Sequence, residues 1–249
     1  MKRLLILGGT GEAAALHEAA GEKFEGGLEV VSSLAGRTNE PRSLPGMTRT
    51  GGFGGVEGLA HWLREEEIDM IVDATHPYAA RISANARTAC EISGVDRAIL
   101  WRPPWTARPG DNWIPVADAA EAAERLPSLG KRAFLALGSG QLWQFADVKG
   151  VWLMSRVAET PEPHTAPPGF VVVGRGPFTV DNELRLMEEQ DIDLLVSRNS
   201  GGEATVGKII AARQRRIPVI MLERPAPEPG EQCSDLKEVL QWIARKLER

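Results

Sequence analysis

The opening of the chain constrains its fold more than any other part of the sequence. Residues 4–7 form an apolar run that ends directly at Gly8-Gly9-Thr10-Gly11, and residues 11–20 then place apolar side chains on one face of a helix. A buried strand that turns through glycines into a helix is how a doubly wound α/β fold begins. The apolar run is too short for the core of a signal peptide or for a membrane span.

Strand and helix signals alternate along the rest of the chain. We predict strands over residues 3–7, 28–33, 69–74, 98–101, 113–116, 133–137, 151–156, 170–173, 194–197 and 219–222. We predict helices over residues 11–20, 56–67, 79–93, 118–126, 180–190, 203–213 and 235–247, and residues 36–55 form a Gly/Pro-rich region. Such alternation predicts mainly parallel sheets with helices on both faces.

Prolines and a glycine interrupt the alternation between residues 103 and 110, which predicts a domain boundary there. The predicted fold class is therefore α/β, with two Rossmann-like doubly wound domains over residues 1–110 and 111–249. We expect the active site of such a chain in the cleft between its two domains.

Charge and composition argue against several functions. The net charge of −5 is unlike that of a general nucleic-acid binder, which is usually basic. Cys90 and Cys233 have no CxxC spacing and the four histidines no HxxxH spacing, so we expect neither a disulfide framework nor a protein-held metal. No apolar stretch reaches membrane length, so we expect a soluble, cytoplasmic protein without a membrane partner.

Glycines at the first strand–helix junction have the spacing of a dinucleotide-binding loop. Gly9, Gly11 and Ala14 fit the pattern GxGxxG/A, which allows a tight turn, close approach of a diphosphate and close helix packing. The N–H groups and positive dipole of the following helix would face the anion. The predicted coenzyme contacts here are Gly9, Thr10, Gly11, Glu12 and Ala13. The alternative is a purely structural turn.

The end of the second predicted strand favours NADPH over NADH. NAD-specific sites usually carry Asp or Glu at this point, which holds the 2′-hydroxyl of the adenosine ribose. This chain has Ser32 and Ser33, then Arg37, and no acid before Glu40. Small hydroxyls and an arginine suit a 2′-phosphate, so we predict that these three residues contact NADPH. The alternative for Arg37 is a solvated loop position.

The short-chain dehydrogenase mechanism is excluded, because it needs a Tyr-xxx-Lys pair. The only tyrosine of the chain is Tyr78, and Ile82 stands where the lysine would be.

The segment Asp73-Ala74-Thr75-His76-Pro77-Tyr78 follows a predicted strand, at the sheet edge where open α/β sheets bind ligands. We predict that Thr75 and Pro77 line the nicotinamide half of the coenzyme site. His76 is a catalytic candidate, since a histidine near neutrality can donate a proton or a hydrogen bond, and Tyr78 is the second candidate. The alternative for His76 is a loop-capping role.

The segment Gly51-Gly52-Phe53-Gly54-Gly55 is too rich in glycine for a simple linker. Glycines would let the backbone approach a ligand closely, and we predict that Gly52 and Phe53 contact the coenzyme. The alternative is a flexible surface loop.

Several motifs of the chain occur together in one known family. They are Gly8-Gly9-Thr10-Gly11-Glu12-Ala13, Ser33-Leu34-Ala35-Gly36-Arg37-Thr38, Arg49-Thr50-Gly51-Gly52-Phe53-Gly54-Gly55, Asp73-Ala74-Thr75-His76-Pro77-Tyr78-Ala79, Gly174-Arg175-Gly176-Pro177-Phe178, Ser197-Arg198-Asn199-Ser200-Gly201-Gly202 and Pro218-Val219-Ile220-Met221-Leu222-Glu223-Arg224-Pro225. With these motifs in this order, the chain resembles the precorrin-6A reductase family of cobalamin biosynthesis over its whole length. One departure is Arg198, where we expect lysine in many members.

The resemblance implies an enzyme, an NAD(P)H-dependent oxidoreductase that acts on a CH–CH bond. A hydride would pass from NADPH to a double bond of the precorrin-6A macrocycle, and a proton would complete the reduction to precorrin-6B. The chemistry belongs to the nicotinamide, so the protein must place its C4 against the target carbon and exclude water. The implied partners are a small-molecule tetrapyrrole and, for its handover, other corrin-pathway enzymes.

Three strand-end loops of the second half are candidates for a polar substrate face. The resemblance implies a tetrapyrrole with several acetate and propionate groups, and guanidinium groups bind carboxylates in bidentate fashion. The predicted substrate contacts are Ser139, Arg175, Arg198, Asn199, Ser200 and Gly201. The alternative for both arginines is an ordinary surface position.

Three other functions stay open at this stage. The chain could reduce cobalt-precorrin-6A with NADH, as an enzyme of the cobalt-dependent branch. It could sense NADP without turnover, although it shows no helix-turn-helix signal and no basic patch. It could also be a methyltransferase of the same pathway, since glycine-rich α/β sites also bind S-adenosylmethionine.

Overall fold

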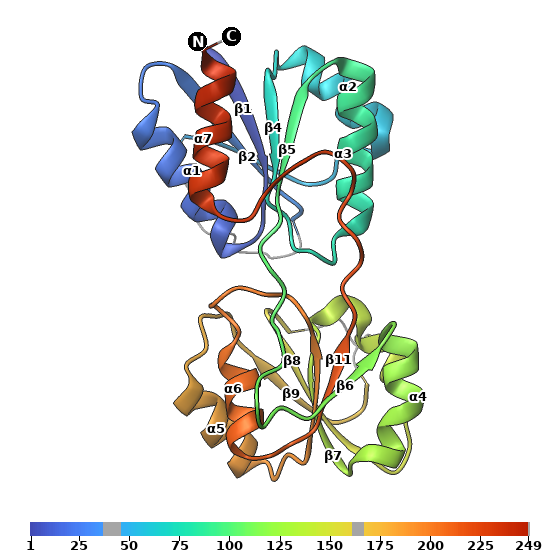
Figure 1. Cartoon of the computed structure of the whole chain (residues 1–249). Coiled ribbons are helices and arrows are strands. Elements are labelled where there is room, and N and C mark those ends of the chain that lie inside the picture. The colour runs from blue at the N-terminus through green and yellow to red at the C-terminus, as the bar shows by residue number, and fades with distance from the viewer. Residues whose placement is uncertain (37–45, 161–166, 249) are drawn as a thin grey trace. The chain divides into compact units, whose positions relative to one another are not determined.

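The computed structural model describes residues 1–36, 46–160 and 167–248. The chain folds into two compact units, of which the first comprises Met1–Pro103 and Pro225–Arg249 and the second Pro104–Arg224. The chain therefore passes from one unit to the other twice (Figure 1). None of the helices in the described ranges is long and apolar enough to span a membrane.

Six parallel strands form the sheet of the first unit, in the order β12-β5-β4-β1-β2-β3. The strands are β1 (Lys2–Leu7), β2 (Leu28–Leu34), β3 (Met47–Thr50), β4 (Met70–Asp73), β5 (Asp96–Leu100) and β12 (Glu231–Cys233). The helices are α1 (Gly11–Lys23), α2 (Gly55–Glu65), α3 (Ala80–Ser93) and α7 (Leu236–Leu247). Helices α1 and α7 cover one face of this sheet, and α2 and α3 cover the other (Figure 1).

The side chains of β1 supply both cores of the first unit. Leu4 and Ile6 pack with α1 and α7, whereas Leu5 and Leu7 pack with α2 and α3. Successive side chains of a strand point to opposite faces, so a central strand that is covered on both sides needs an unbroken apolar run. Burial of this run fixes the position of the glycine loop that follows Leu7.

Six parallel strands also form the sheet of the second unit, in the order β6-β11-β10-β7-β8-β9. The strands are β6 (Trp113–Val116), β7 (Arg132–Ala136), β8 (Trp152–Val157), β9 (Phe170–Val173), β10 (Leu194–Arg198) and β11 (Val219–Leu222). The helices are α4 (Ala119–Leu129), the 3-10 helix η1 (Ser139–Phe145), α5 (Val180–Glu189) and α6 (Gly207–Gln214). Helices α5 and α6 lie on one face of the sheet and α4 on the other (Figure 1).

The predicted α/β class with parallel sheets is confirmed. The sequence does not predict β3, β12 or η1, and for the two strands there is a physical reason. Strand β3 has four residues, none of them buried, in a Gly/Pro-rich region, and β12 has only three residues. Without a buried apolar face, such short strands give no periodic signal.

The predicted second domain, residues 111–249, is wrong at its C-terminal end. Residues 225–249 belong to the first unit, because β12 pairs with β5 through Cys233 and Leu100. Helix α7 then buries Trp242 fully in the core that contains Leu4. Elements close in sequence are usually close in space, so a linear scan of elements assigns this segment to its neighbours. The active-site cleft between the two domains stays a prediction.

Candidate functional site

The switch point of the first sheet lies between β1 and β4. In doubly wound sheets, ligands bind at the carboxyl ends of the strands where the strand order reverses. Leu7 and Asp73 are paired at the ends of these two strands. The loops that follow them carry the predicted residues Gly9–Ala13 and Thr75–Tyr78, so the structure brings the two groups to one edge of the sheet.

Thr10 joins the two loops. Its Oγ1 accepts a hydrogen bond of 3.0 Å from the N–H of Ala13 and so caps the N-terminus of α1. The same hydroxyl donates to the carbonyl oxygen of Ala74, at 2.9 Å. The start of α1 is therefore held directly against the end of β4, and the remaining N–H groups of its first turn have no intrahelical acceptor.

Open space surrounds two of the loop glycines. Gly9 has a backbone φ of +106°, which residues with a side chain rarely adopt. A Cβ added to Gly9 or Gly11 would meet no atom within 4 Å. A Cβ on Gly8 would lie 3.3 Å from Cβ of Ala13, so Gly8 provides the close approach of the turn to the helix. An uncovered glycine backbone at a helix N-terminus fits a diphosphate, so the residues present suit a dinucleotide.

Glu12 lies in the first turn of α1, where a bare carboxylate would repel a diphosphate. Its Oε1 lies 3.1 Å from Nη1 of Arg102, whose side chain is 14% exposed. Burial lowers the pKa of Arg102 and Glu12 raises it, but an arginine keeps its charge at neutral pH. Arg102 therefore balances the charge of Glu12 at this edge. Sequence reasoning missed it, because Arg102 stands in the proline-rich segment that it interprets as a boundary.

The ends of β2 and β3 form the neighbouring part of the same edge. The N–H of Gly8 donates to the carbonyl of Ser33 at 2.9 Å, which brings the end of β2 against the glycine loop. The Ser32 hydroxyl is instead committed to the face below α1, where it lies 2.8 Å from Nδ1 of buried His17. The predicted residue Arg37 lies outside the described residues.

The Gly51–Gly55 segment begins at this edge too. The N–H of Gly51 donates to the carbonyl of Leu34 at 2.8 Å, and the carbonyls of Gly51 and Gly52 accept hydrogen bonds from Arg49. Phe53 lies under the guanidinium of Arg49, 3.8 Å from its carbon to the ring centroid. The predicted contacts Gly52 and Phe53 are therefore anchored to this edge of the sheet by Arg49, a residue that the sequence reasoning did not select.

The loop after β4 has a defined hydrogen-bonding state. Asp73 Oδ1 accepts from the N–H of Thr75 at 3.1 Å and from its hydroxyl at 2.7 Å. His76 Nδ1 accepts from the N–H of Tyr78 at 3.3 Å, and the two rings lie 5.6 Å apart. Because Nδ1 is an acceptor, the neutral imidazole carries its proton on Nε2. The geometry suits His76 to donate a hydrogen bond from Nε2.

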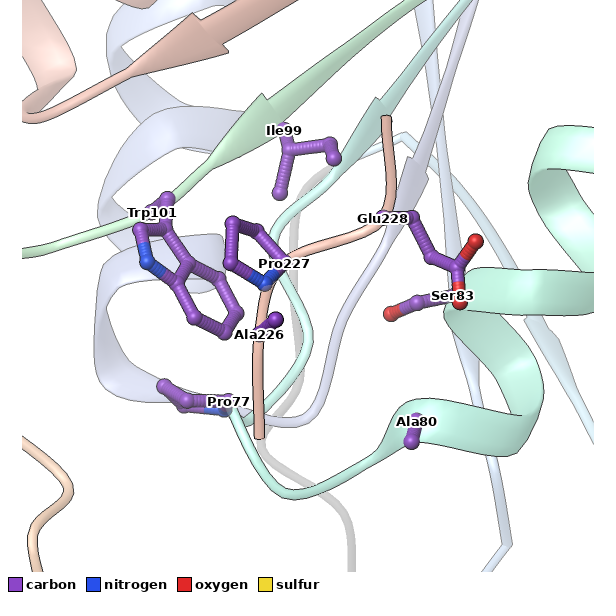
Figure 2. A pocket seen from close by; sticks show the side chains of 8 residues that line it. All are labelled: Pro77, Ala80, Ser83, Ile99, Trp101, Ala226, Pro227 and Glu228. Atoms are coloured by element: carbon purple, nitrogen blue, oxygen red, sulfur yellow. The ribbon is translucent and has the colours of Figure 1, made fainter. Parts of the chain in front are cut away.

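A small hollow of about 20 Å³ lies beside this loop, at the end of β5. Figure 2 shows its lining, with the rings of Trp101, Pro227 and Pro77 on one side and the polar ends of Ser83 and Glu228 on the other. The C-terminal segment supplies Pro227 and Glu228, and the carboxylate of Glu228 is held by Arg87 Nε at 2.9 Å. Sequence reasoning missed this contribution because it assigned the segment to the other domain.

The second sheet has its own switch point, between β7 and β10. The predicted residue Ser139, which is exposed, begins η1 just after β7, and Arg198 ends β10 with residues 199–201 directly after it. Nη2 of Arg198 lies 3.5 Å from the position of a Cβ on Gly138, so the structure brings these two segments together. Arg175 follows β9 and forms an ion pair of 2.5 Å with Glu159.

Asn199 has a structural task. Its Oδ1 accepts from the N–H of Trp105 at 2.8 Å, and its Nδ2 donates to the carbonyl of Trp105 at 3.0 Å. The Trp105 indole donates to the carbonyl of Gly202 at 2.9 Å. These bonds use the polar atoms of the Asn199 side chain to hold the start of the second unit. Ser200 and Gly201 are buried beside it.

Lys208, in the first turn of α6, is buried in the same region. Its Nζ donates to the carbonyl of Thr205 at 2.9 Å and lies 4.9 Å from the ring centroid of Trp105. Burial lowers the pKa of Lys208 to about 7, and the charges of Arg156 and Arg198 act in the same direction. Sequence reasoning did not select Lys208, because it stands in an otherwise ordinary helix pattern.

Neither cysteine is set up for thiolate chemistry. Burial raises the pKa of Cys90 to about 12 and that of Cys233 to about 11, and both side chains are buried free thiols. Reactive cysteines need a lowered pKa and access to solvent.

Known proteins resemble the chain over its whole length. A sequence model of the family described as precorrin-6x reductase CbiJ/CobK matches residues 3–244. A precorrin-6A reductase of Rhodococcus erythropolis is 45% identical over 250 residues, which cover 100% of this chain and 100% of that protein. A solved structure described as CobK precorrin-6A reductase is 42% identical with a TM-score of 0.93, and the match covers 99% of this chain and 97% of that chain.

A relative from the cobalt-dependent branch is more distant. A cobalt-precorrin-6A reductase of Salmonella typhimurium is 29% identical over 243 residues, which cover 90% of this chain and 88% of that protein.

Proposed function

The chain belongs to the precorrin-6x reductase CbiJ/CobK family, and we propose that it reduces a double bond of precorrin-6A with NADPH to give precorrin-6B. The observation that carries the coenzyme half of this proposal is the open glycine loop at the start of α1. It lies at the switch point of the first sheet, where Gly9 and Gly11 leave the backbone uncovered.

Different residues around this loop bind different parts of the coenzyme. The N–H groups at the start of α1 bind the diphosphate, and the ends of β2 and β3 take the adenosine side. The loop after β4 and the hollow beside it take the nicotinamide side, where the rings of Trp101, Pro77 and Pro227 exclude water. NADPH, when bound, supplies a hydride from C4 of its nicotinamide.

NADPH rather than NADH is favoured by the end of β2. Residues 28–36 contain one acid, Glu29, at the opposite end of the strand, and Ser33 stands where an acid would hold a ribose 2′-hydroxyl. Arg37 supports the same choice as a predicted partner of the 2′-phosphate.

The substrate carboxylates are assigned to the second unit. Arg198 and Arg175 supply guanidinium groups, and Ser139 and Ser200 supply hydroxyls at the same sheet edge. Asn199 acts indirectly, because it holds Trp105. The cobalt-free substrate is favoured, because the R. erythropolis precorrin-6A reductase is more similar to the chain than the cobalt-precorrin-6A reductase.

The test is an anaerobic assay of the purified protein with precorrin-6A and NADPH, followed by the near-ultraviolet absorbance of the reduced nicotinamide. We expect absorbance to fall in proportion to the precorrin-6A supplied, and to fall faster than with equal NADH. A steady absorbance with active precorrin-6A present would contradict the function. The same assay with cobalt-precorrin-6A in place of precorrin-6A tests the cobalt-dependent alternative. A mixture with S-adenosylmethionine tests the methyltransferase alternative, and a mixture without substrate tests the sensor alternative.

The same assay separates the proposed roles of three residues. Arg37→Ala should raise KM for NADPH more than KM for NADH, because only NADPH has the 2′-phosphate. His76→Ala should lower kcat, because the Nε2 hydrogen bond is lost at the reacting end. Arg198→Ala should raise KM for precorrin-6A and leave NADPH affinity intact. Equal effects of Arg37→Ala on the KM values of both coenzymes would refute the role of Arg37. Unchanged turnover in His76→Ala would refute the role of His76, and a loss of NADPH affinity in Arg198→Ala would refute the role of Arg198.

A further inference from the structure

Arg49 lies beside the end of β2, next to Ser33. Strand β3 pairs with β2 in a register that sets Arg49 opposite Ser33. The residue at this end of β2 is the one that meets the adenosine ribose in dinucleotide-binding sheets. An acid there would bind the 2′-hydroxyl and repel a phosphate, but this chain has a serine whose Oγ accepts a hydrogen bond of 3.2 Å from Arg49 Nη1.

The guanidinium of Arg49 is held in place on three sides. Nη1 also donates to the carbonyl of Gly51 at 2.9 Å, and Nη2 donates to the carbonyl of Gly52 at 3.1 Å. The group lies over Phe53, whose ring in turn meets Trp62 edge to face at 5.4 Å. A planar cation fixed in this way has lost its rotamer freedom before a ligand arrives, which favours binding.

The fixed cation keeps capacity for an anion. A guanidinium has five N–H groups, and the three hydrogen bonds above use three of them. Within the described ranges, Arg49 forms no ion pair with a carboxylate, and its side chain is only partly buried. Burial lowers the pKa of Arg49, but arginine stays charged at neutral pH. A positive charge with unused donors therefore faces the ribose end of the site.

We infer that Arg49 binds the 2′-phosphate of the coenzyme and is a specificity-determining residue for NADPH over NADH. This inference rests on the proposed use of a pyridine dinucleotide. A purely structural role would be to hold the Gly51–Gly55 segment through the carbonyls of Gly51 and Gly52. The two roles predict different results for a ligand without the 2′-phosphate. If Arg49 only holds the segment, its removal weakens the binding of this ligand as well; if Arg49 binds the 2′-phosphate, the binding of this ligand is unchanged.

The test is isothermal titration calorimetry of the whole protein with adenosine 2′,5′-bisphosphate and with AMP, which differs from it only in lacking the 2′-phosphate. Wild-type protein should bind the 2′,5′-bisphosphate more tightly. Arg49→Gln should weaken the binding of this ligand by about ten- to a hundredfold, the range expected for loss of charged hydrogen bonds, and leave the affinity for AMP unchanged. Arg49→Lys should recover part of the loss, since it restores charge without the fork. Arg64→Gln, an exposed arginine in the last turn of α2, is the matched control.

Three outcomes would overturn the inference. They are an intact preference in Arg49→Gln, an equal loss of affinity for both ligands, and a wild type without any preference for the 2′-phosphate. The binding readout needs no precorrin, so failure of the reductase assay and failure of this inference are separate results. Near-ultraviolet circular dichroism of each variant checks that the core around Phe53 and Trp62 is retained.

Discussion

Lys208 is a lysine whose side chain is buried away from water. Its amine is buried near Arg156 and Arg198, and Glu183 is the carboxylate that partly offsets these charges. Glu183 is already paired with Arg156, at 2.7 Å. A lysine whose charged form is disfavoured by burial and by like charges destabilises the fold at a pH where the unfolded chain would be protonated.

We predict that this residue gives the protein a pH-dependent stability. Between about pH 7 and 8, below the ordinary pKa of the two buried thiols, the unfolded chain holds a proton on this lysine that the folded chain has largely released, so stability rises with pH. The rise is at most about 1.4 kcal/mol per pH unit for one group. Urea unfolding across this range should show the rise in wild type and in the exposed control Lys149→Met, but not in Lys208→Met. Parallel curves for all three proteins would contradict the assignment.

The candidate site was predictable at residues whose role depends on the backbone. Gly9 and Gly11 lie at the open loop that their spacing predicts, because a tight turn between strand and helix is a local property. Side chains that act across the fold were not predictable. Arg49 reaches Ser33 and Asn199 reaches Trp105 through pairings that depend on sheet register and chain path, which one sequence does not reveal.

The N-terminus of α1 is the element on which the proposed coenzyme site depends. Thr10 caps it and also binds the carbonyl of Ala74, so one hydroxyl supports both the helix and its attachment to β4. An N-cap contributes about 1 kcal/mol and a further hydrogen bond a similar amount.

Thr10→Val should therefore lower the free energy of unfolding by about 1–2 kcal/mol. Thr10→Ser keeps the hydroxyl and should restore most of the loss. Urea denaturation of the three proteins measures the difference. Equal stability of wild type and Thr10→Val would show that the hydroxyl does not support the element.

Burial, rather than length, separates a strand that was predicted from one that was missed. The strand predicted over residues 219–222 is β11, whose four residues are all buried. Strand β3 has the same length but no buried residue, and it becomes a strand only by pairing with β2. Its pairing brings Arg49 to the site, so the missed element and the missed residue have one cause.

At the scale of the whole molecule, the two sheets share one strand order. Strands β1 to β5 of the first sheet correspond in order to β7, β8, β9, β10 and β11 of the second. The edge position beside β5 is taken by β12, and the edge position beside β11 is taken by β6. The edge strand β6 directly follows the first unit in the sequence, and the edge strand β12 directly follows the second unit. The chain therefore crosses between the units once before each of these strands.

The return of the C-terminal segment places both ends of the chain in the first unit. Nζ of Lys2 donates to the carbonyl of Lys246 at 2.8 Å, and the segment that precedes β12 lines the hollow beside the nicotinamide end of the proposed site. The proposed coenzyme site therefore combines the first and last parts of the sequence.

The central claim is that the backbone at the start of α1 holds the coenzyme diphosphate. Its most direct test is calorimetric titration of NADPH into wild type, Gly11→Val and Gly21→Val. Both glycines belong to α1, and an added Cβ at either meets no atom within 4 Å, but only Gly11 lies at the proposed site. We expect wild type and Gly21→Val to bind NADPH, and Gly11→Val to bind it at least about tenfold more weakly. Equal affinity of all three proteins, or no binding of either reduced coenzyme by wild type, would contradict the claim.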